Sequence, residues 1–476
     1  MQEERYVVTA DFGTSKIALS VVAVTSGIPN LIFYKKAESE GVTRDNVFNP
    51  QKAALPLKGL IVEAEEKCGI KITKVIVNLP RWNVKAEKIS HKVMRNDSSE
   101  YITPDEIENL KNMAVSEIEN RISDSSVIYG ILTQSFSTED LFQVDEESVI
   151  GATGSELEGY FLVFIGPRKY RNNLDRVMNE LGIAVSNYAF SPICESKYVL
   201  NDDEKEHGVA LIEIGAGVTS VSVYHHGIMR AYKAFPFGGK VITSDIHTEC
   251  SIPNTLAEKI KVNLGYCMSN KLLNMSEKII QFEGRNDVHH QLTVKYLAEI
   301  IENRMKEIVN ACMYIIGESG YEDKLRNGIV LSGGGAEIRL CQSLISNMTG
   351  LPCRIAYPKL FESPSENSME GIALSAVANP YINCAQDSLE QEKVVEKAEE
   401  PENENLFDDE EMGTIKEQPA KKEEKREKKP KKEKHGLFGS LSKGVGELTK
   451  GMGSLFDGIY SAATNGDDDT DEYFRV

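Results

Sequence analysis

Two residues with metal- and phosphate-binding chemistry, Asp11 and Lys16, lie inside a short hairpin near the start of the chain. The stretch Tyr6 to Val24, YVVTADFGTSKIALSVVAV, consists of two apolar strand-like runs separated by a few acidic, small and basic residues. A carboxylate at a strand end, followed by small residues, lets backbone N–H groups approach an anion, and an ammonium group adds charge-assisted hydrogen bonds. The alternative is an ordinary hairpin turn through Gly and Thr.

The same pattern occurs a second time, which argues against an ordinary turn. The stretch Gly208 to Gly227, GVALIEIGAGVTSVSVYHHG, aligns with the first without a gap and places Glu213 on Asp11 and Gly215 on Gly13. Two such loops facing each other would clamp a polyphosphate and its metal ion. The sequence therefore predicts a phosphate site built from two copies of one hairpin.

A third glycine-rich loop lies in Asn327 to Leu340, NGIVLSGGGAEIRL, where an apolar strand is followed by small residues and the start of a helix. On its own this is a common way to turn a corner in an α/β protein. Its place after the two hairpins favours a role in the same site.

Composition narrows the class of protein. The 476 residues exceed what one core supports and predict two or more domains. A net charge of −19 argues against general nucleic-acid binding. The eight cysteines have no paired spacing, no apolar run is long enough to span a membrane, and the charged start MQEERYVV does not resemble a signal peptide. We therefore expect a cytoplasmic chain with reduced thiols.

The elements that must position these loops alternate between strands and helices up to about Asn383, which favours an α/β fold. Val75 to Pro80 reads as a buried strand, and Leu60 to Cys68 before it as a helix. Residues 84–159 read as an insertion, with a helix that begins at the N-cap Thr103. The segment Tyr160 to Leu200 then returns to a strand, helix, strand, helix order.

The remainder of the chain has a different amino-acid composition. Acidic and then basic blocks over 384–434 predict a disordered linker, and 463–476 an acidic tail. Between them, 435–462 predicts an amphipathic helix that glycines weaken in water. Such a helix commonly packs on its own protein, but the long linker and the preceding lysines favour an anionic membrane surface. The residues of its apolar face are Leu437, Phe438, Leu441, Val445, Leu448, Met452, Leu455, Phe456 and Ile459.

The order of DFGTSK, EIGAGVTS and VLSGGGAEI resembles the actin-like ATPase superfamily, in which two similar domains close over ATP and a divalent metal. The stretches FSPICESKYVL, FPFGGKVITSDIHTE and AEKIKVNLG, together with the insertion and the tail, resemble the FtsA family of bacterial cell-division proteins. This resemblance implies an actin-like two-domain fold with ribonuclease-H-like halves and an inserted small α+β subdomain. The implied divisions are 1–83, 160–205 and 366–383 for subdomain 1A, 84–159 for 1C, 206–237 and 310–365 for 2A, and 238–309 for 2B.

The resemblance also implies roles for individual residues. Asp11 and Glu213 are the implied catalytic carboxylates, and Asp11 would hold Mg²⁺ through water. The alternative for two of the implied nucleotide contacts, Glu258 and Lys261, is a solvated pair on a helix surface. The full set of implied ATP contacts is Gly13, Thr14, Ser15, Lys16, Gly215, Ala216, Gly217, Glu258, Lys261, Gly333, Gly334 and Gly335.

The second loop departs from the family pattern, which reads Asp-Ile-Gly-Gly-Gly-Thr. Here Glu213 lengthens the carboxylate arm, Ala216 adds a Cβ and Val218 removes a hydroxyl. Phosphoryl transfer depends mainly on positioning, so a displaced carboxylate slows hydrolysis more than it weakens binding. We expect ATP binding with slow or negligible turnover.

The implied function is to polymerise and to anchor the ring of the tubulin-like protein FtsZ to the cytoplasmic face of the cell membrane at the division site. The implied partners are the FtsZ C-terminal peptide, at Asn303, Arg304 and Lys306 of subdomain 2B, other division proteins at subdomain 1C, and further copies of the chain. A solvated helix face is the alternative for the 2B residues. Two other functions remain open: a sugar- or acetate-kinase-like phosphotransferase, for which the sequence identifies no acceptor site, and a pilus-assembly scaffold, which lacks a membrane-binding tail.

Overall fold

In the computed structural model, two five-stranded sheets share one strand order, β3-β2-β1-β7-β11 in the first and β14-β13-β12-β17-β18 in the second. The structure describes residues 4–272, 275, 277–283 and 289–387, and all of the described elements lie in one unit, Met1–Glu392. The strands of the first sheet are β1 (Arg5–Phe12), β2 (Lys16–Thr25), β3 (Ile28–Glu38), β7 (Lys74–Leu79) and β11 (Ala184–Phe190). Those of the second are β12 (Val209–Ile214), β13 (Thr219–His225), β14 (Ile228–Phe235), β17 (Ile329–Ser332) and β18 (Cys353–Ile355).

The two hairpins predicted as a repeat have the same register. Asp11 pairs with Ala18 across β1 and β2, and Glu213 pairs with Ser220 across β12 and β13. In addition, β1 pairs in parallel with β7, and β12 pairs in parallel with β17. The predicted internal repeat is therefore confirmed at the level of strand pairing, and each copy ends with its carboxylate at the same point of its sheet.

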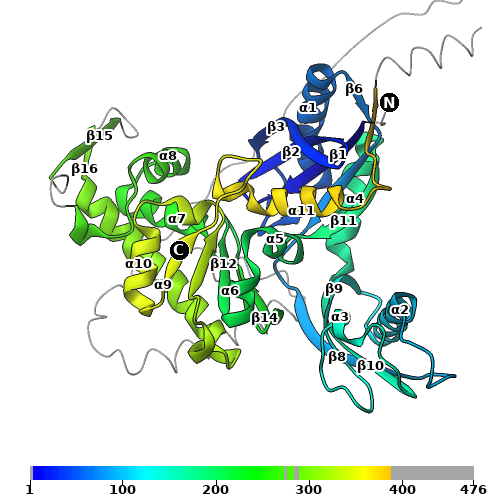
Figure 1. Cartoon of the computed structure of the whole chain (residues 1–476). Helices are drawn as coiled ribbons and strands as arrows, with labels where there is room; N and C mark the ends of the chain where they lie inside the picture. Colours follow the sequence, from blue (N-terminus) through cyan, green and yellow to red (C-terminus); the bar gives the residue numbers. More distant parts are fainter. Residues whose placement is uncertain (1–3, 273–274, 276, 284–288, 388–476) are drawn as a thin grey trace, which may run out of the picture. The chain divides into compact units, whose positions relative to one another are not determined.

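Helices join and cover these sheets. In the half of the molecule that contains the first sheet, α1 packs against α4, and α11 packs against both α5 and β1. The last described helix therefore lies beside the N-terminal strands (Figure 1). The predicted helix at Leu60–Cys68 is the second part of α1, which begins earlier, after the N-cap Asn49, despite the internal Pro56. The helices of this half are α1 (Pro50–Cys68), α4 (Arg168–Leu181), α5 (Ser191–Val199) and α11 (Asn367–Val377).

In the second half the long helix α9 contacts β13, α7 and α10 through a buried apolar stripe. The helices here are α6 (Asp202–His207), α7 (Gly239–Cys250), α8 (Asn254–Leu264), α9 (Val294–Glu318) and α10 (Cys341–Thr349). The short strands of the described chain are β4 (Val42–Thr43), β5 (Asn46–Val47), β6 (Ile70–Ile72), β15 (Ile279–Glu283), β16 (His289–Thr293) and β19 (Ala385–Asp387).

The insertion forms its own three-stranded sheet, β8-β10-β9, with a separate core against α2. The helix α2 begins as predicted: Thr103 accepts from the Glu106 N–H and Glu106 accepts from the Thr103 N–H, a complete capping box. The elements are β8 (Lys85–Met94), α2 (Pro104–Arg121), β9 (Ser126–Ser137), α3 (Glu146–Val149) and β10 (Glu156–Pro167).

Two sequence boundaries need correction. The strand expected to return to the first domain at Tyr160 is part of β10, which runs to Pro167 and pairs with β8 and β9 of the insertion. The linker expected from residue 384 begins with an ordered segment, because Ala385–Asp387 pairs with Ile70–Ile72 as strand β19. Strand ends in both places are set by partners distant in the sequence. The subdomain divisions themselves stay a prediction.

The chain crosses from the first sheet to the second through α5, and it returns to the first just before α11. These two helices touch at Gly371. A Cβ on Gly371 would lie 2.6 Å from the backbone N and Cα of Glu195. We predict that Gly371→Ala forces the helices apart and lowers the free energy of unfolding by about 1–3 kcal/mol in urea titration. Gly59→Ala, in α1 with nothing within 4 Å, is the control and should raise it by up to about 1 kcal/mol. Equal effects at the two positions would contradict the close contact.

Candidate functional site

The loops of both hairpins line one cavity of about 390 Å³. The helix α8 and the glycine loop after β17 also line it. Of the residues implied to bind ATP or to act in catalysis, all but Gly217 line this cavity. They are Asp11, Gly13, Thr14, Ser15, Lys16, Glu213, Gly215, Ala216, Glu258, Lys261, Gly333, Gly334 and Gly335.

Two glycines allow the loops to approach so closely. Gly217 packs against the first loop, because a Cβ on it would lie 2.5 Å from Thr14 Oγ1. Gly333 has φ +81°, and a Cβ on it would lie 2.5 Å from the Ile214 carbonyl oxygen. A larger residue at either position would separate segments that the cavity requires to be adjacent.

The ammonium group of Lys16 is held by neighbours that the sequence did not suggest. Its Nζ donates to Glu366 Oε1 (2.8 Å), Ser365 Oγ (2.9 Å) and the Ser365 carbonyl (3.1 Å). The carboxylate of Glu366 is only 3% exposed and also accepts from Tyr34. Although burial favours its neutral form, the charge of Lys16 and these hydrogen bonds lower the pKa of Glu366 to about 2.

Asp11 lies at the end of β1 beside Asn78, whose Nδ2 donates to Asp11 Oδ1 (2.7 Å). Burial raises the pKa of Asp11, and the bond from Asn78 and the charge of Lys16 oppose the rise. The Asn78 Oδ1 atom is buried and has no hydrogen-bond partner among the described residues. An acceptor therefore remains available next to the carboxylate.

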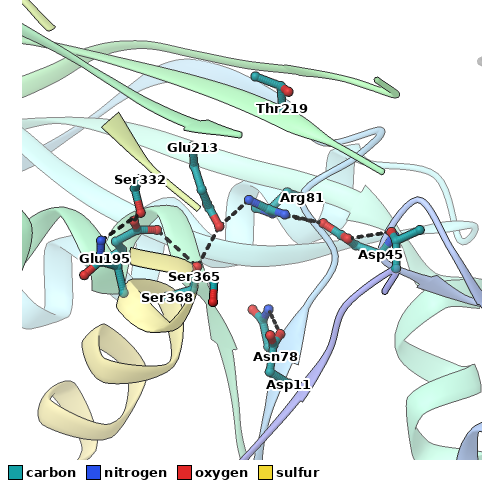
Figure 2. A network of polar contacts seen from close by, with 12 residues as sticks. Asp11, Asp45, Asn78, Arg81, Glu195, Glu213, Thr219, Ser332, Ser365 and Ser368 are labelled. Carbon is teal, nitrogen blue, oxygen red and sulfur yellow. Dashed lines mark hydrogen bonds and ion pairs between the residues drawn. The ribbon is translucent and has the colours of Figure 1, made fainter. Parts of the chain in front are cut away.

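Glu213, the equivalent carboxylate in the second copy, has different surroundings. The guanidinium of Arg81 forms an ion pair with it through Nη1, and Ser368 Oγ donates to Glu213 Oε1 (2.7 Å). The Nε and Nη2 atoms of Arg81 donate to Asp45 Oδ2 at 3.0 and 2.7 Å (Figure 2). Burial alone would lower the pKa of Arg81, but the charges of Asp45 and Glu213 raise it well above its ordinary value.

A second buried carboxyl, Glu195 of α5, lies behind Glu213 and is 0% exposed. Ser332 donates to Glu195 Oε1, and Ser368 Oγ lies 3.2 Å from Oε2 (Figure 2). Burial and the negative charge of Glu213 raise the pKa of Glu195 well above its ordinary value. The raised pKa favours the neutral form of Glu195, which reduces the cost of burying this carboxyl beside Glu213.

Glu258 and Lys261 of α8 are not the solvated pair considered above. The Lys261 side chain is 7% exposed, and its Nζ donates to Glu258 Oε2 (2.7 Å), Thr243 Oγ1 (2.8 Å) and the Gly239 carbonyl (2.8 Å). Burial lowers the pKa of Lys261, and the charge of Glu258 opposes this. The interpretation as an exposed helix pair is therefore wrong for Lys261.

Comparison with known proteins supports the relationship suggested by the motifs. A family model described as "Cell division protein FtsA" matches residues 210–384. The cell division protein FtsA of Enterococcus hirae is 26% identical over 348 residues, 73% of this chain and 77% of that protein. FtsA of Streptococcus pneumoniae is 28% identical over 359 residues, 75% of this chain and 77% of that protein. Over about three quarters of its length, the chain is similar to these FtsA cell-division proteins.

The fold agrees with this similarity. A solved structure of the PilM-PilN type IV pilus biogenesis complex superimposes with a TM-score of 0.54 at 15% identity, covering 78% of this chain and 98% of that chain. Together with the two sheets of identical strand order, this confirms the actin-like α/β fold expected from the FtsA resemblance.

The partner-binding residues implied by the FtsA resemblance lie on α9. Asn303 is exposed, Arg304 donates to both carboxylate oxygens of Asp245 (2.6 and 2.9 Å), and Lys306 pairs with Glu302 (2.7 Å). The two cations are thus already paired within this half, and an acidic partner would have to compete with these contacts.

The implied membrane-binding residues from Leu437 to Ile459 lie outside the described residues, as do the linker from 388 and the acidic tail 463–476. Over the part of the chain that the structure describes, every helix is too short or too polar to cross a membrane.

The ion pair of Glu366 predicts an acid-dependent stability. A pKa of about 2 in the folded state lies below the ordinary 4.5, so its contribution is present above pH 4.5 and is lost as the pH falls toward 2. We predict that Glu366→Gln lowers the free energy of unfolding by about 2 kcal/mol at pH 6 and by much less at pH 3, measured by urea titration. Glu362→Gln, at an exposed position of the same segment, should have little effect at either pH. A Glu366→Gln effect that is equal at both values would contradict this account.

Proposed function

We propose that this chain is an ATP-binding, actin-like cell-division protein that polymerises and tethers the division ring to the cytoplasmic face of the membrane. The observation that carries the proposal is the meeting of two copies of one hairpin at a single cavity, with Lys16 and Asp11 on one side and Glu213 on the other. The relatives in the FtsA family are named as cell-division proteins, which supports the same process for this chain.

The lining of the cavity fits a nucleoside triphosphate. Lys16 and Lys36 would bind the phosphates together with the N–H groups of Gly13 to Ser15. Asp11 would hold Mg²⁺ through water, and the unpaired acceptor of Asn78 suits a metal-bound water. The metal, when bound, neutralises part of the phosphate charge.

The sugar and base would lie farther from the first loop. Glu258 and Lys261 would contact the ribose, and the glycines at 333–335 the adenosine, because backbone without side chains leaves room for a flat ligand. Glu213 already accepts from Ser368 and pairs with Arg81, so it has little freedom to orient water. We therefore expect slow or negligible hydrolysis.

The nucleotide site predicts a ligand-dependent stability. ATP with Mg²⁺ at one hundred times its dissociation constant should raise the free energy of unfolding by about 2.7 kcal/mol. The shift, followed as the thermal midpoint, should shrink in Lys16→Ala, which removes a cation from the cavity. Lys67→Ala, an exposed lysine of α1 paired with Glu63, should keep the full shift. A wild-type midpoint that does not respond to millimolar ATP would remove the basis of the nucleotide assignment.

The proposed partners follow from the similarity to FtsA proteins. The C-terminal peptide of FtsZ would bind 238–309, where Asn303 is exposed. Arg304 and Lys306 would pair with acidic groups of the peptide in place of their present carboxylate partners within the chain. The insertion would recruit other division proteins, and further copies of the chain would assemble into filaments.

The membrane tether is tested on the segment 435–462. A peptide of these residues should show little helix by circular dichroism in buffer and substantial helix on anionic vesicles, because its glycines disfavour a helix in water and its apolar face stabilises insertion. In the whole chain, Phe438→Glu with Phe456→Glu should abolish sedimentation with vesicles, since each new charge must be desolvated.

A matched control places the same two charges on the polar face. Ser440→Glu with Ser454→Glu should retain most of the vesicle binding. If both double variants behave alike, or if the wild-type peptide stays without helix on vesicles, the membrane-tether proposal is wrong.

A further inference from the structure

A continuous line of buried polar contacts joins the first hairpin loop to the second. The Thr14 hydroxyl donates to Asp45 Oδ1 (3.0 Å) and accepts from the Asp45 N–H (3.0 Å). Asp45 accepts from Arg81, and Arg81 forms an ion pair with Glu213 at the end of β12 (Figure 2). All four residues are at most 8% exposed.

Arg81 contacts both halves of the molecule through its backbone and through its side chain. It follows β7 of the first sheet, yet its carbonyl accepts from the Tyr232 hydroxyl of β14 (3.0 Å). Its guanidinium also lies on the backbone of the second loop, because a Cβ on Gly215 would be 2.7 Å from Nη2. Both loops are thus held to one planar group.

We propose that Arg81 is a positioning residue for nucleotide binding: it sets the distance between the two phosphate loops, so that both contact the same phosphate chain. The inference rests on the proposed nucleotide site and adds to it a residue that lies outside all of the motifs. A loop ordered before the ligand arrives loses less conformational freedom on binding, so the affinity is higher.

Arginine is required here because of its geometry. Its guanidinium presents donors on two sides, and in this site one side faces Asp45 and the other faces Glu213. A lysine ammonium keeps the charge but cannot span both carboxylates in the same way. Arg81→Lys therefore releases at least one loop while it keeps a cation beside the buried acids.

The experiment measures ATP affinity by calorimetric titration of the full chain with Mg²⁺ present, alongside the thermal midpoint of each variant. We expect Arg81→Lys to weaken ATP binding at least tenfold. The control is Arg95→Lys in the insertion, where an arginine with a 4% exposed side chain donates to both oxygens of Glu106 and does not line the cavity. It should lower the midpoint and leave ATP affinity within twofold of wild type.

A second variant keeps the test valid if Arg81→Lys does not fold. Asp45→Asn retains the acceptor Oδ1 for Thr14 and leaves Arg81 with one carboxylate partner, so charges remain balanced. It interrupts only the link between Arg81 and the first loop, and we expect ATP affinity to fall at least fivefold. Adding Asp45→Asn to Arg81→Lys should then cause less than the product of the two separate losses.

The outcomes separate the two proposals. If the wild-type chain does not bind ATP, the proposed function fails. If wild type binds and both Arg81→Lys and Asp45→Asn bind within twofold of it, the nucleotide site stands and the positioning role of Arg81 is wrong. If Arg95→Lys weakens ATP binding as much as Arg81→Lys does, the effect reflects general destabilisation, and the positioning role is again wrong.

Discussion

A guanidinium buried where two sheets meet cannot be solvated by water, so the chain around Arg81 has to supply its partners. Asp45 and Glu213 do so from opposite sides. Their geometry in turn determines where the first loop can lie, through Thr14, and where β12 can end. Because removing one member leaves the others buried without their partners, this group couples the positions of the two hairpins.

The two halves share a scaffold and differ in chemistry. Strand order and hairpin register are the same, and each first strand delivers a carboxylate to the cavity. Asp11 has an amide donor and a neighbouring free acceptor, whereas Glu213 has a cation, a hydroxyl and a second carboxyl beside it. One loop is therefore suited to receive a hydrated metal, and the other is occupied by the protein's own charges.

Sequence patterns predicted the parts of this molecule whose causes are local. The strand β7, the capped start of α2 and the repeated hairpins follow from apolar runs, an N-cap with its Glu, and small residues at turns. Prediction was wrong where distant partners decide an end: β10 continues to Pro167 because β8 and β9 pair with it, and β19 forms because β6 is available. Lys261 was open to either interpretation until its burial was known.

The sequence by itself therefore determined the two hairpins and the third glycine loop, since spacing within a short segment is enough to specify a loop, whereas the individual cavity residues were implied by the resemblance to the FtsA family. Only the tertiary structure decided which charges neutralise one another. Lys16 pairs with Glu366, 350 residues away, and Arg81 lies between Asp45 and Glu213. Such pairs leave no local pattern, because an ion pair requires only that two side chains meet in a place from which water is excluded, and the fold alone creates that place.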